Sequence, residues 1–572
     1  MINYLIVFTL LTGLALSEDA HVQTPLGPIK GLELIDKESG AKIYQFRGIR
    51  FAKAPTGDLR FSKPVAVDPW TEEYDATEFG DACPQTVMEM LNDGSERQSE
   101  DCLNLNVYVP KTLDKNEKLS VMVWIHGGGL LVGNGFSYDG TRMAIDGNVV
   151  VVTFNYRVGN LGFMSLFHSA CRGNFGLWDQ ILALKWVQNN IASFRGDPNS
   201  VTIFGESAGG WSVSYQTLIP SNKGLFKRAI AQSGVASRYS VQRRKHAEET
   251  VHGLSEKTKC PMGDSTKFID CLRKASVESL LNDDLLSMSE DKVDPEYTIG
   301  PVVDGELFPA HPIELLEDPN SPQSIFFGSI DFVAGATSQE GLVHFAIMPK
   351  AQELYNFNIT EGITSEFVHK GMIKPFVDAH FDGNTEIEEK MKNFYLTDAS
   401  LADQANMAAE FFGDMFFTPY VADKLKHHAR MKNGKTYQYQ VSKPMPAVFG
   451  DFGGHPSWFK GCGHGEELVH LFYSDTPINN KGTAMFNITL TDEEKVLSKK
   501  MIRYWSSFAK TGIPSAGDDS LPWLEYDSER KIYMDFDLDL SLRQNWKSDQ
   551  VKLWTEDFPP IRTDPPFQHD EL

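Results

Sequence analysis

The sequence predicts an α/β fold in which a central, mostly parallel sheet is flanked by helices within a single large domain. In the first half of the chain, short apolar runs with the composition of buried strands alternate with segments whose apolar residues recur at helical spacing. This alternation is typical of a parallel sheet covered by helices. No linker divides the chain into independent units, so we expect one domain over residues 18–560.

The predicted elements follow one another in a regular order. Apolar runs at 121–125 and 149–154 are predicted as strands, and a helix is predicted over 177–194, where apolar residues recur every three or four positions. That helix should stop before the helix-breaking residues at 196–198. A further strand at 200–204 leads directly into a glycine-flanked serine.

That serine is the candidate nucleophile. In the pattern Gly205-x-Ser207-x-Gly209, a strand turns sharply into a helix and leaves the hydroxyl at the edge of the sheet. The flanking glycines remove side chains that would collide in such a turn. The small residues that begin at Ala208 can start the helix behind it. We therefore expect Ser207 to attack a carbonyl group.

A second glycine run supplies candidate hydrogen-bond donors. His126 and three glycines directly follow the strand predicted at 121–125. Acyl transfer places negative charge on the former carbonyl oxygen, and backbone N–H groups must already point at it. We assign Gly128, Gly129 and the N–H of Ala208 to this oxyanion hole.

A serine nucleophile also needs a base. In this arrangement the chain order is serine, then Asp or Glu, then histidine. His464 fits because it lies late in the chain on a glycine-flanked loop, with His455 and His470 as competitors. The remaining histidines, including the pair His427 and His428, are interpreted as surface residues.

The acid that orients the base is less well defined by the residues. Glu340 lies just beyond a predicted strand at 332–336, where its carboxylate could hold the imidazole in the correct tautomer. By spacing alone, Asp304 and Asp331 are nearly as plausible.

The composition argues against several classes of partner. The net charge is -23 and the pI is about 5.1, so the surface repels nucleic acids and anionic membranes. After the first residues, no run is long and apolar enough to span a bilayer. No histidines show metal-ligand spacing, so we expect no metal and no cofactor.

Both ends of the chain carry targeting features. Residues 1–17 form a short apolar run that ends in small residues, which predicts a cleaved signal peptide. The tail, 561–572, ends in His569-Asp570-Glu571-Leu572, a signal read by a retrieval receptor. We therefore expect the lumen of the endoplasmic reticulum, with secretion as the alternative. Sequons at Asn358 and Asn487 predict glycosylation.

The cysteines fit an oxidising compartment. In a chain with a signal peptide, six cysteines are read as mostly disulfides. Two short loops are enclosed by pairs of cysteines, and two cysteines are left over, either paired or free. The enclosing pairs are Cys83 with Cys102 and Cys260 with Cys271, and the remaining residues are Cys171 and Cys462.

Together these motifs resemble the carboxylesterase/cholinesterase family, the type-B carboxylesterases, over almost the whole mature chain. Further segments match the family in order, namely 46–52, 100–108, 173–180, 301–305 and 505–512. The resemblance implies an α/β-hydrolase fold and a triad of Ser207, Glu340 and His464. It also implies the disulfides Cys83–Cys102 and Cys260–Cys271, and a buried Ser233 that supports the acid and the histidine.

Departures from the family pattern narrow the expected substrate. Cholinesterases have a tryptophan in the first disulfide loop that binds a quaternary ammonium, whereas this loop has Met88, Met90 and Leu91 but no aromatic residue. Juvenile hormone esterases have glutamine where this chain has Glu206, and Leu130 replaces a common phenylalanine. We therefore expect a small-molecule substrate, a neutral carboxylic ester, hydrolysed with broad specificity. The alternatives are an enzyme dedicated to one hormone, pheromone or lipid ester, and a non-catalytic adhesion protein.

Overall fold

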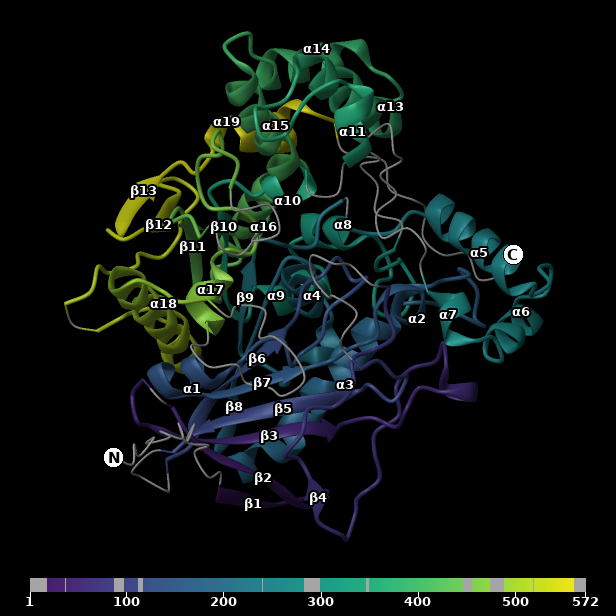
Figure 1. Cartoon of the computed structure of the whole chain (residues 1–572), viewed down its shortest axis with the longest axis vertical. Coiled ribbons are helices and arrows are strands. Elements are labelled where there is room, and N and C mark those ends of the chain that lie inside the picture. Colours follow the sequence, from purple (N-terminus) through teal and green to yellow (C-terminus); the bar gives the residue numbers. More distant parts are fainter. Residues whose placement is uncertain are drawn as a thin grey trace, which may run out of the picture.

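The predicted α/β fold is confirmed by a 13-stranded sheet that runs through the described part of the chain and is flanked by helices (Figure 1). The computed structural model describes residues 18–559 except 37, 87–96, 112–116, 239, 282–298, 346–348, 446–454, 474–487 and 518. The predicted signal peptide, the C-terminal tail, Asn487 and the apolar residues Met88, Met90 and Leu91 lie outside the described residues.

The middle of the sheet is parallel and its outer parts are antiparallel. In chain order the strands are β1 (Glu18–Thr24), β2 (Gly27–Ile35), β3 (Lys42–Arg50), β4 (Tyr74–Asp75), β5 (Asn104–Pro110), β6 (Leu119–Ile125), β7 (Val150–Phe154), β8 (Gly196–Glu206), β9 (Arg228–Gln232), β10 (Asp331–Thr337), β11 (Thr436–Val441), β12 (Ile532–Phe536) and β13 (Ser541–Gln544). The parallel part has the order β7-β6-β8-β9-β10-β11-β12. Strands β1, β2, β3 and β5, and β13 at the far edge, pair antiparallel.

Helices cover both faces of this sheet and extend beyond it. They are α1 (Thr141–Gly147), α2 (Gly159–Phe163), α3 (Phe175–Asn190), α4 (Ala208–Gln216), α5 (Arg244–Thr258), α6 (Ser265–Leu272), α7 (Val277–Leu280), α8 (Pro312–Glu317), α9 (Pro322–Phe327), α10 (Leu342–Phe345), α11 (Pro349–Leu354), α12 (Ser365–Phe367), α13 (Lys374–Phe381), α14 (Thr385–Tyr395), α15 (Leu401–Phe416), α16 (Thr418–Ala429), α17 (Leu468–Phe472), α18 (Asp492–Thr511) and α19 (Ser548–Lys552). A π-helical turn, η6 (Leu553–Asp557), follows α19.

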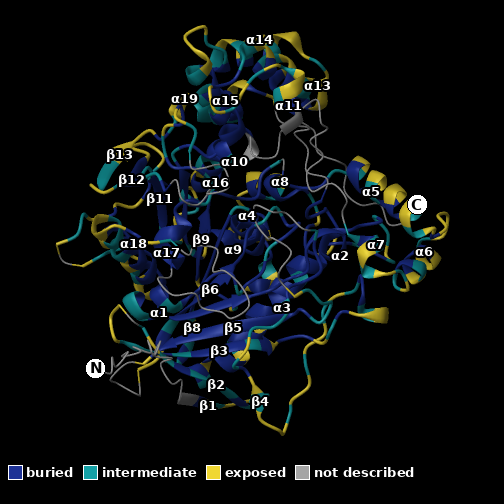
Figure 2. Cartoon of the chain, in the orientation of Figure 1, coloured by how far each residue is buried: buried dark blue, intermediate teal, exposed yellow. Residues whose placement is uncertain are grey.

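The apolar strands are buried on both faces, which explains their nearly continuous hydrophobic runs. Successive side chains of a strand point to opposite faces. In β6, Val121, Val123 and Ile125 join the core shared with α3 and α4, whereas Met122 and Trp124 join the core shared with α17 and α18. Figure 2 shows these central strands as buried and the outer helices, such as α5 and α6, as partly exposed.

The predicted helix over 177–194 is shorter than expected at its C-terminal end. The α-helix α3 ends at Asn190, and a 3₁₀ turn, η2 (Ile191–Phe194), continues to the predicted end. Arg195, in a left-handed conformation with φ 66°, then ends the turn ahead of the predicted breakers at 196–198. The helix-breaking residues 196–198 do not form a loop, because strand β8 already begins at Gly196.

The prediction that the histidine pair lies at the surface is wrong for His428. Its side chain is fully buried, with Nδ1 2.7 Å from Thr436 Oγ1 and Nε2 3.0 Å from the Ile330 carbonyl oxygen. The reason is that α16 packs against β10 and β11, and His428 lies on its inward side. His427 is half-buried, beside Asp423. Other histidines interpreted as surface residues are also buried, namely His126, His246, His311 and His380.

Both disulfides implied by the resemblance are present. Cys83 is bonded to Cys102, and Cys260 to Cys271, while Cys171 and Cys462 are buried free thiols. The second disulfide joins the segment before α6 to α6 itself, and it belongs to a small satellite core beneath α5 and α6. Among the described helices, none has both the length and the apolar character that a membrane span requires.

A buried ion pair connects the end of β7 to α3. The guanidinium of Arg157 donates to both carboxylate oxygens of Asp179 at 2.7 and 2.8 Å, and the backbone N–H of Arg157 donates to the same carboxylate. Their side chains are 3% and 0% exposed. Removing one partner of such a pair leaves a charge buried without compensation.

We therefore expect Asp179→Asn to lower the free energy of unfolding by about 3–5 kcal/mol, as measured by denaturant unfolding. The matched control is Glu248→Gln, which breaks the exposed Arg244–Glu248 pair. It should change the free energy by less than about 1 kcal/mol. Similar small losses in both variants would contradict a structural role for the buried pair.

Candidate active site

Ser207 lies in a strained turn between β8 and α4. Its backbone has φ 59° and ψ -126°, a conformation rarely adopted by residues other than glycine. The N–H of Ser207 donates to the Gln232 carbonyl oxygen at 2.9 Å, and the N–H of Trp211 donates to the Ser207 carbonyl at 2.9 Å. The turn is therefore held from both sides, and Ser207 is half-buried within an otherwise buried segment.

The predicted need for glycine at 209 has a direct steric cause. A Cβ atom built on Gly209 would lie 2.0 Å from the carbonyl oxygen of Ile125, at the end of β6. The start of α4 therefore contacts the backbone of the neighbouring strand. No side chain fits between them, and this contact fixes where the helix begins relative to Ser207.

The glycine loop after β6 lies next to Ser207. A Cβ atom built on Gly127 would be 3.1 Å from the Cβ of Ser207. Gly128 and Gly129 have φ values of 98° and 65°, and the Gly128 carbonyl accepts hydrogen bonds from two following residues. The N–H groups of Gly128 and Gly129 bond to no other backbone group that the structure describes. Ala208, the third predicted donor, is the first residue of α4, where N–H groups have no intrahelical partner.

Two further side chains hold this loop in place. The Tyr156 hydroxyl donates to the His126 carbonyl oxygen at 2.9 Å, and the two rings stack with their centroids 4.2 Å apart. Burial lowers the pKa of His126 to about 4, so its ring is neutral at physiological pH. His126 therefore supports the loop and is unsuited to be a base.

The structure brings Glu340, His464 and Ser233 together. Glu340 Oε2 lies 2.5 Å from His464 Nδ1, and Ser233 Oγ donates to Glu340 Oε1 at 2.6 Å. The N–H of Thr337, at the end of β10, also donates to Glu340 at 2.6 Å. Glu340 is 1% exposed. Its carboxylate is thus oriented by three donors, one of which is the candidate base.

The competing acids and bases lie elsewhere. Asp304 accepts three backbone N–H bonds within its own turn, and Asp331 pairs with Arg228. His455 contacts Glu466. His470 is fully buried in α17, and burial lowers its pKa to about 4.

The other imidazole nitrogen of His464 faces the residue that precedes the nucleophile. His464 Nε2 lies 3.1 Å from Glu206 Oε1, and no hydrogen bond joins it to Ser207 Oγ. Hydrogen bonds of catalytic groups are often formed fully only when substrate is bound.

Three buried carboxyl groups surround His464. Burial raises the pKa of Glu206 and of Glu467, and the charge of Glu340 adds to the rise. Burial by itself would also raise the pKa of Glu340. The positive charge of His464 and the hydrogen bonds from His464, Ser233 and Thr337 outweigh the effect of burial, so the pKa of Glu340 is lowered. Burial alone would lower the pKa of His464, yet the carboxylates of Glu206 and Glu340 raise it above its usual range. Glu340 is therefore the ionised partner of the imidazole.

Sequence reasoning missed Phe417, which stacks on His464. The two rings are 4.5 Å apart at an interplanar angle of 27°. Phe417 is 2% exposed and lies between α15 and α16, with φ -131° and ψ -69°. No motif marks this position, because only the fold brings a residue between two helices onto the imidazole.

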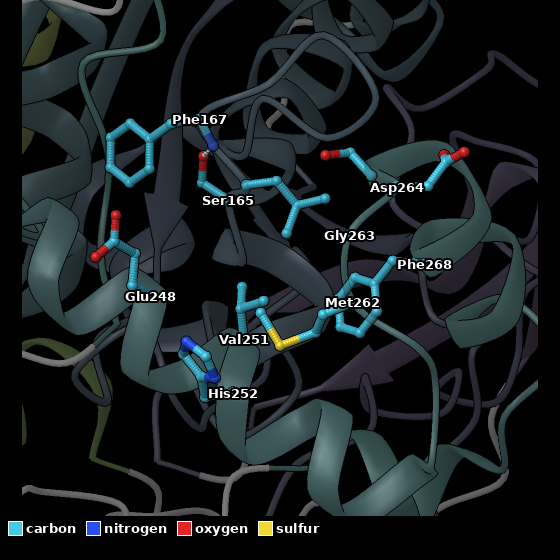
Figure 3. Close-up of a pocket in the computed structure, with 11 residues that line it drawn as sticks. Ser165, Phe167, Glu248, Val251, His252, Met262, Gly263, Asp264 and Phe268 are labelled. Carbon is cyan, nitrogen blue, oxygen red and sulfur yellow. Dashed lines mark hydrogen bonds between the residues drawn. The ribbon is translucent and has the colours of Figure 1, made fainter. Parts of the chain in front are cut away.

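A surface pocket of about 290 Å³ lies away from these residues, between α5, α6 and the segment after α2 (Figure 3). Val251, Met262 and Phe268 line it, with Glu248 and Asp264 at opposite sides. Neither Ser207, Glu340 nor His464 lines this pocket, so it is separate from the candidate site. Within the described residues, no group of His, Cys, Asp and Glu is arranged to hold a metal ion.

The arrangement contains the parts that acyl transfer requires. It offers a half-buried serine in a strained turn, a glycine loop against that serine, an imidazole that contacts the residue before the serine, and a buried carboxylate behind the imidazole.

Comparisons with known proteins also indicate an ester hydrolase. The model of the carboxylesterase family matches residues 18–554. Human bile salt-activated lipase is 34% identical over 543 residues, which cover 90% of this chain and 66% of that protein. The precursor of the medium-chain fatty acyl-CoA hydrolase of the duck Anas platyrhynchos is 32% identical over 97% of this chain and 95% of that protein. Rabbit liver carboxylesterase 1 is 32% identical over 94% of this chain and 93% of that protein. The chain belongs to the carboxylesterase family and is a carboxylic-ester hydrolase.

Proposed function

We propose that the protein hydrolyses neutral carboxylic esters through an acyl-enzyme formed on Ser207, with His464 as general base and acid and Glu340 as its orienting partner. The observation that carries this proposal is the chain of contacts from Ser233 through Glu340 to His464, which lies beside the strained serine turn. Ser233 is a positioning residue, because it touches Glu340 and not the reacting atoms.

The chemistry follows from these positions. Ser207 Oγ attacks the ester carbonyl carbon while His464 Nε2 takes the serine proton. The N–H groups of Gly128, Gly129 and Ala208 stabilise the oxyanion of the tetrahedral intermediate. The intermediate collapses, and His464 gives the proton to the leaving alcohol. Water, deprotonated by the same imidazole, then attacks the acyl-enzyme and releases the carboxylic acid.

Broad specificity is the favoured version of the proposal. The matched relatives are named for different acyl compounds, including a lipase, a fatty acyl-CoA hydrolase and a liver carboxylesterase. The absence of an aromatic residue between Cys83 and Cys102 argues against choline esters. An enzyme dedicated to one hormone, pheromone or lipid ester is the second candidate, which one strongly dominant kcat/KM value would favour. A non-catalytic adhesion role fits poorly with an intact set of triad residues.

The protein is proposed to act in the secretory pathway. Two disulfides are typical of an oxidising compartment. The exposed Asn358, in a surface turn, is accessible to glycosylation. The apolar run at 1–17 and the terminal His-Asp-Glu-Leu support retention in the lumen of the endoplasmic reticulum, with secretion as the alternative.

Replacing the nucleophile is the primary test. Ser207→Ala should lower kcat for 4-nitrophenyl acetate by about 10⁴-fold or more, because the remaining groups cannot form the acyl-enzyme. The matched control is Ser214→Ala, at a buried position of α4, the helix that starts directly after Ser207; its hydroxyl has no hydrogen-bond partner among the described residues. Activity of Ser207→Ala at the parental rate would refute the proposal.

The pH profile tests the electrostatics around His464. Only the neutral imidazole can accept the serine proton, so a raised pKa confines activity to higher pH. Glu206→Gln removes one of the carboxylates that stabilise the protonated ring. We expect the acidic limb of the kcat/KM profile to move to lower pH.

Glu366→Gln, which removes an exposed carboxylate on α12, is the control and should leave the limb in place. If the limb of Glu206→Gln stays in place or moves to higher pH, Glu206 does not raise the pKa of the base.

The stacking of Phe417 on His464 should contribute to catalysis. Phe417→Leu removes an aromatic contact worth about 0.5–1.5 kcal/mol, so kcat/KM should fall by about 2–12-fold. Phe412→Leu, a similar loss of a buried ring on α15, is the control for general destabilisation. Equal activities of the two variants would contradict a role for the stacked ring.

A further inference from the structure

The two segments that carry Glu340 and His464 are joined to each other by a pair of hydrogen bonds. The N–H of Cys462 donates to the hydroxyl oxygen of Ser338 at 2.9 Å. In the opposite direction, the N–H of Gln339 donates to the Cys462 carbonyl oxygen at 2.9 Å. Ser338 and Cys462 each lie two positions before the residue that takes part in the contact between carboxylate and imidazole. This pair of bonds is therefore placed to influence that contact.

The segment that contains Ser338 is firmly supported, because it continues from a central strand of the sheet. Ser338 directly follows β10, and its N–H donates to the carbonyl oxygen of Val441, at the end of the neighbouring strand β11, at 2.8 Å (Figure 1). The next residue, Gln339, is 4% exposed, and its side-chain amide donates to the Asn406 carbonyl oxygen on α15 at 3.4 Å. The sheet and a helix thus hold this segment in place.

The segment that contains His464 has a backbone with more conformational freedom. Residues 461–465 include three glycines, and Gly461 and Gly465 have φ values of 122° and 76°. Because glycine populates many backbone conformations, hydrogen bonds to neighbouring elements must select one of them. The position of the imidazole therefore depends on the anchors on either side of it.

Two such anchors lie on opposite sides of His464 along the chain. On the C-terminal side, the carboxylate of Glu466 accepts a hydrogen bond from the N–H of Met445 at 2.7 Å. On the N-terminal side, the N–H of Cys462 donates to the Ser338 hydroxyl. Of these two anchors, the second reaches the segment that carries the candidate acid, so it bears directly on the contact between acid and base.

The Ser338 hydroxyl lies at a close contact between the two segments. A Cβ atom built on Gly461 would lie 2.7 Å from Ser338 Oγ, and Cys462 is fully buried. Removing the hydroxyl would leave the N–H of Cys462 without its acceptor, and buried N–H groups in folded proteins are almost always hydrogen-bonded. We therefore expect the segment to shift until that N–H finds another acceptor.

We propose that Ser338 is a positioning residue for ester hydrolysis, whose hydroxyl holds the segment of His464 against the segment of Glu340 and so keeps the imidazole in contact with the carboxylate. The proposal rests on the roles of Glu340 and His464 proposed above. Ser338 acts through the backbone of Cys462 rather than on the ester itself.

Kinetics of three variants of the whole mature protein test this role. Ser338→Ala should lower kcat for 4-nitrophenyl acetate by about tenfold or more and change KM by less than about threefold, because a displaced base slows the chemical step. Ser338→Thr retains a hydroxyl and should restore kcat to within about threefold of the parental value. The matched control is Ser442→Ala, which removes a half-buried hydroxyl just after β11 that bonds to Asp535 at 2.6 Å. This control should keep the parental kcat.

Two kinetic outcomes would overturn the proposal. One is an equal kcat in Ser338→Ala and Ser442→Ala, which would show that the hydroxyl of Ser338 matters no more than any other at these strand ends. The other is a loss of activity in Ser338→Ala that Ser338→Thr fails to restore, since the effect would then not depend on the hydroxyl.

A spectroscopic readout separates this proposal from the proposed function. A proton held in the 2.5 Å contact between His464 Nδ1 and Glu340 should give a ¹H NMR signal far downfield, because hydrogen bonds to a carboxylate are short and strong. The signal should be present in the parent and in Ser442→Ala, and weakened or lost in Ser338→Ala, where the contact is looser. An unchanged signal in Ser338→Ala would overturn the proposal. Its absence from the parent would count against the proposed function instead, while the kinetic comparison would still decide the role of Ser338.

Discussion

The close contact between the end of β6 and the start of α4 is the constraint on which the catalytic edge depends. Gly209 leaves no space for a Cβ atom against the carbonyl oxygen of Ile125, so strand and helix meet through their backbones. Ser207 is consequently held at φ 59° between them, and the glycine loop that follows β6 lies within reach of its side chain. The proposed nucleophile and the proposed oxyanion donors are therefore positioned by one backbone contact rather than by separate side-chain interactions.

Burial dominates the electrostatics around this edge. Glu206, Glu340 and Glu467 are all within 5% of complete burial, and together they surround one imidazole. Three carboxylates cannot all remain ionised in such a place, because mutual repulsion and lost hydration favour protonation. Glu340 stays ionised because it receives hydrogen bonds from Ser233 and Thr337 as well as the contact with His464. The hydrogen-bond donors, rather than the position of the carboxylate alone, decide which carboxyl group stays ionised beside His464.

Buried ionisable groups outside this edge follow the same physics with different outcomes. Arg157 and Asp179 compensate each other in a dry environment and link β7 to α3. Lys424 is similarly buried, but within the described residues its Nζ has no hydrogen-bond partner and lies against the ring of Phe327. The charges of the first pair compensate each other, whereas burial lowers the pKa of Lys424 well below its usual range.

The sequence by itself determined the parallel α/β sheet, the turn at Ser207 and the glycine loop after β6, because these depend on local patterns of apolar residues and glycine. It also suggested His464 from its glycine-flanked loop. It could not choose Glu340 over Asp304 and Asp331, since all three follow the same local rules and only the resemblance to a family separated them. Only the tertiary structure places Glu340 against His464 and closes Asp304 into its own turn, and this contact is what supports Glu340 as the proposed acid. It alone revealed Phe417 on the imidazole, Glu206 at Nε2 and His428 in the core, because these contacts join segments that are far apart in the chain.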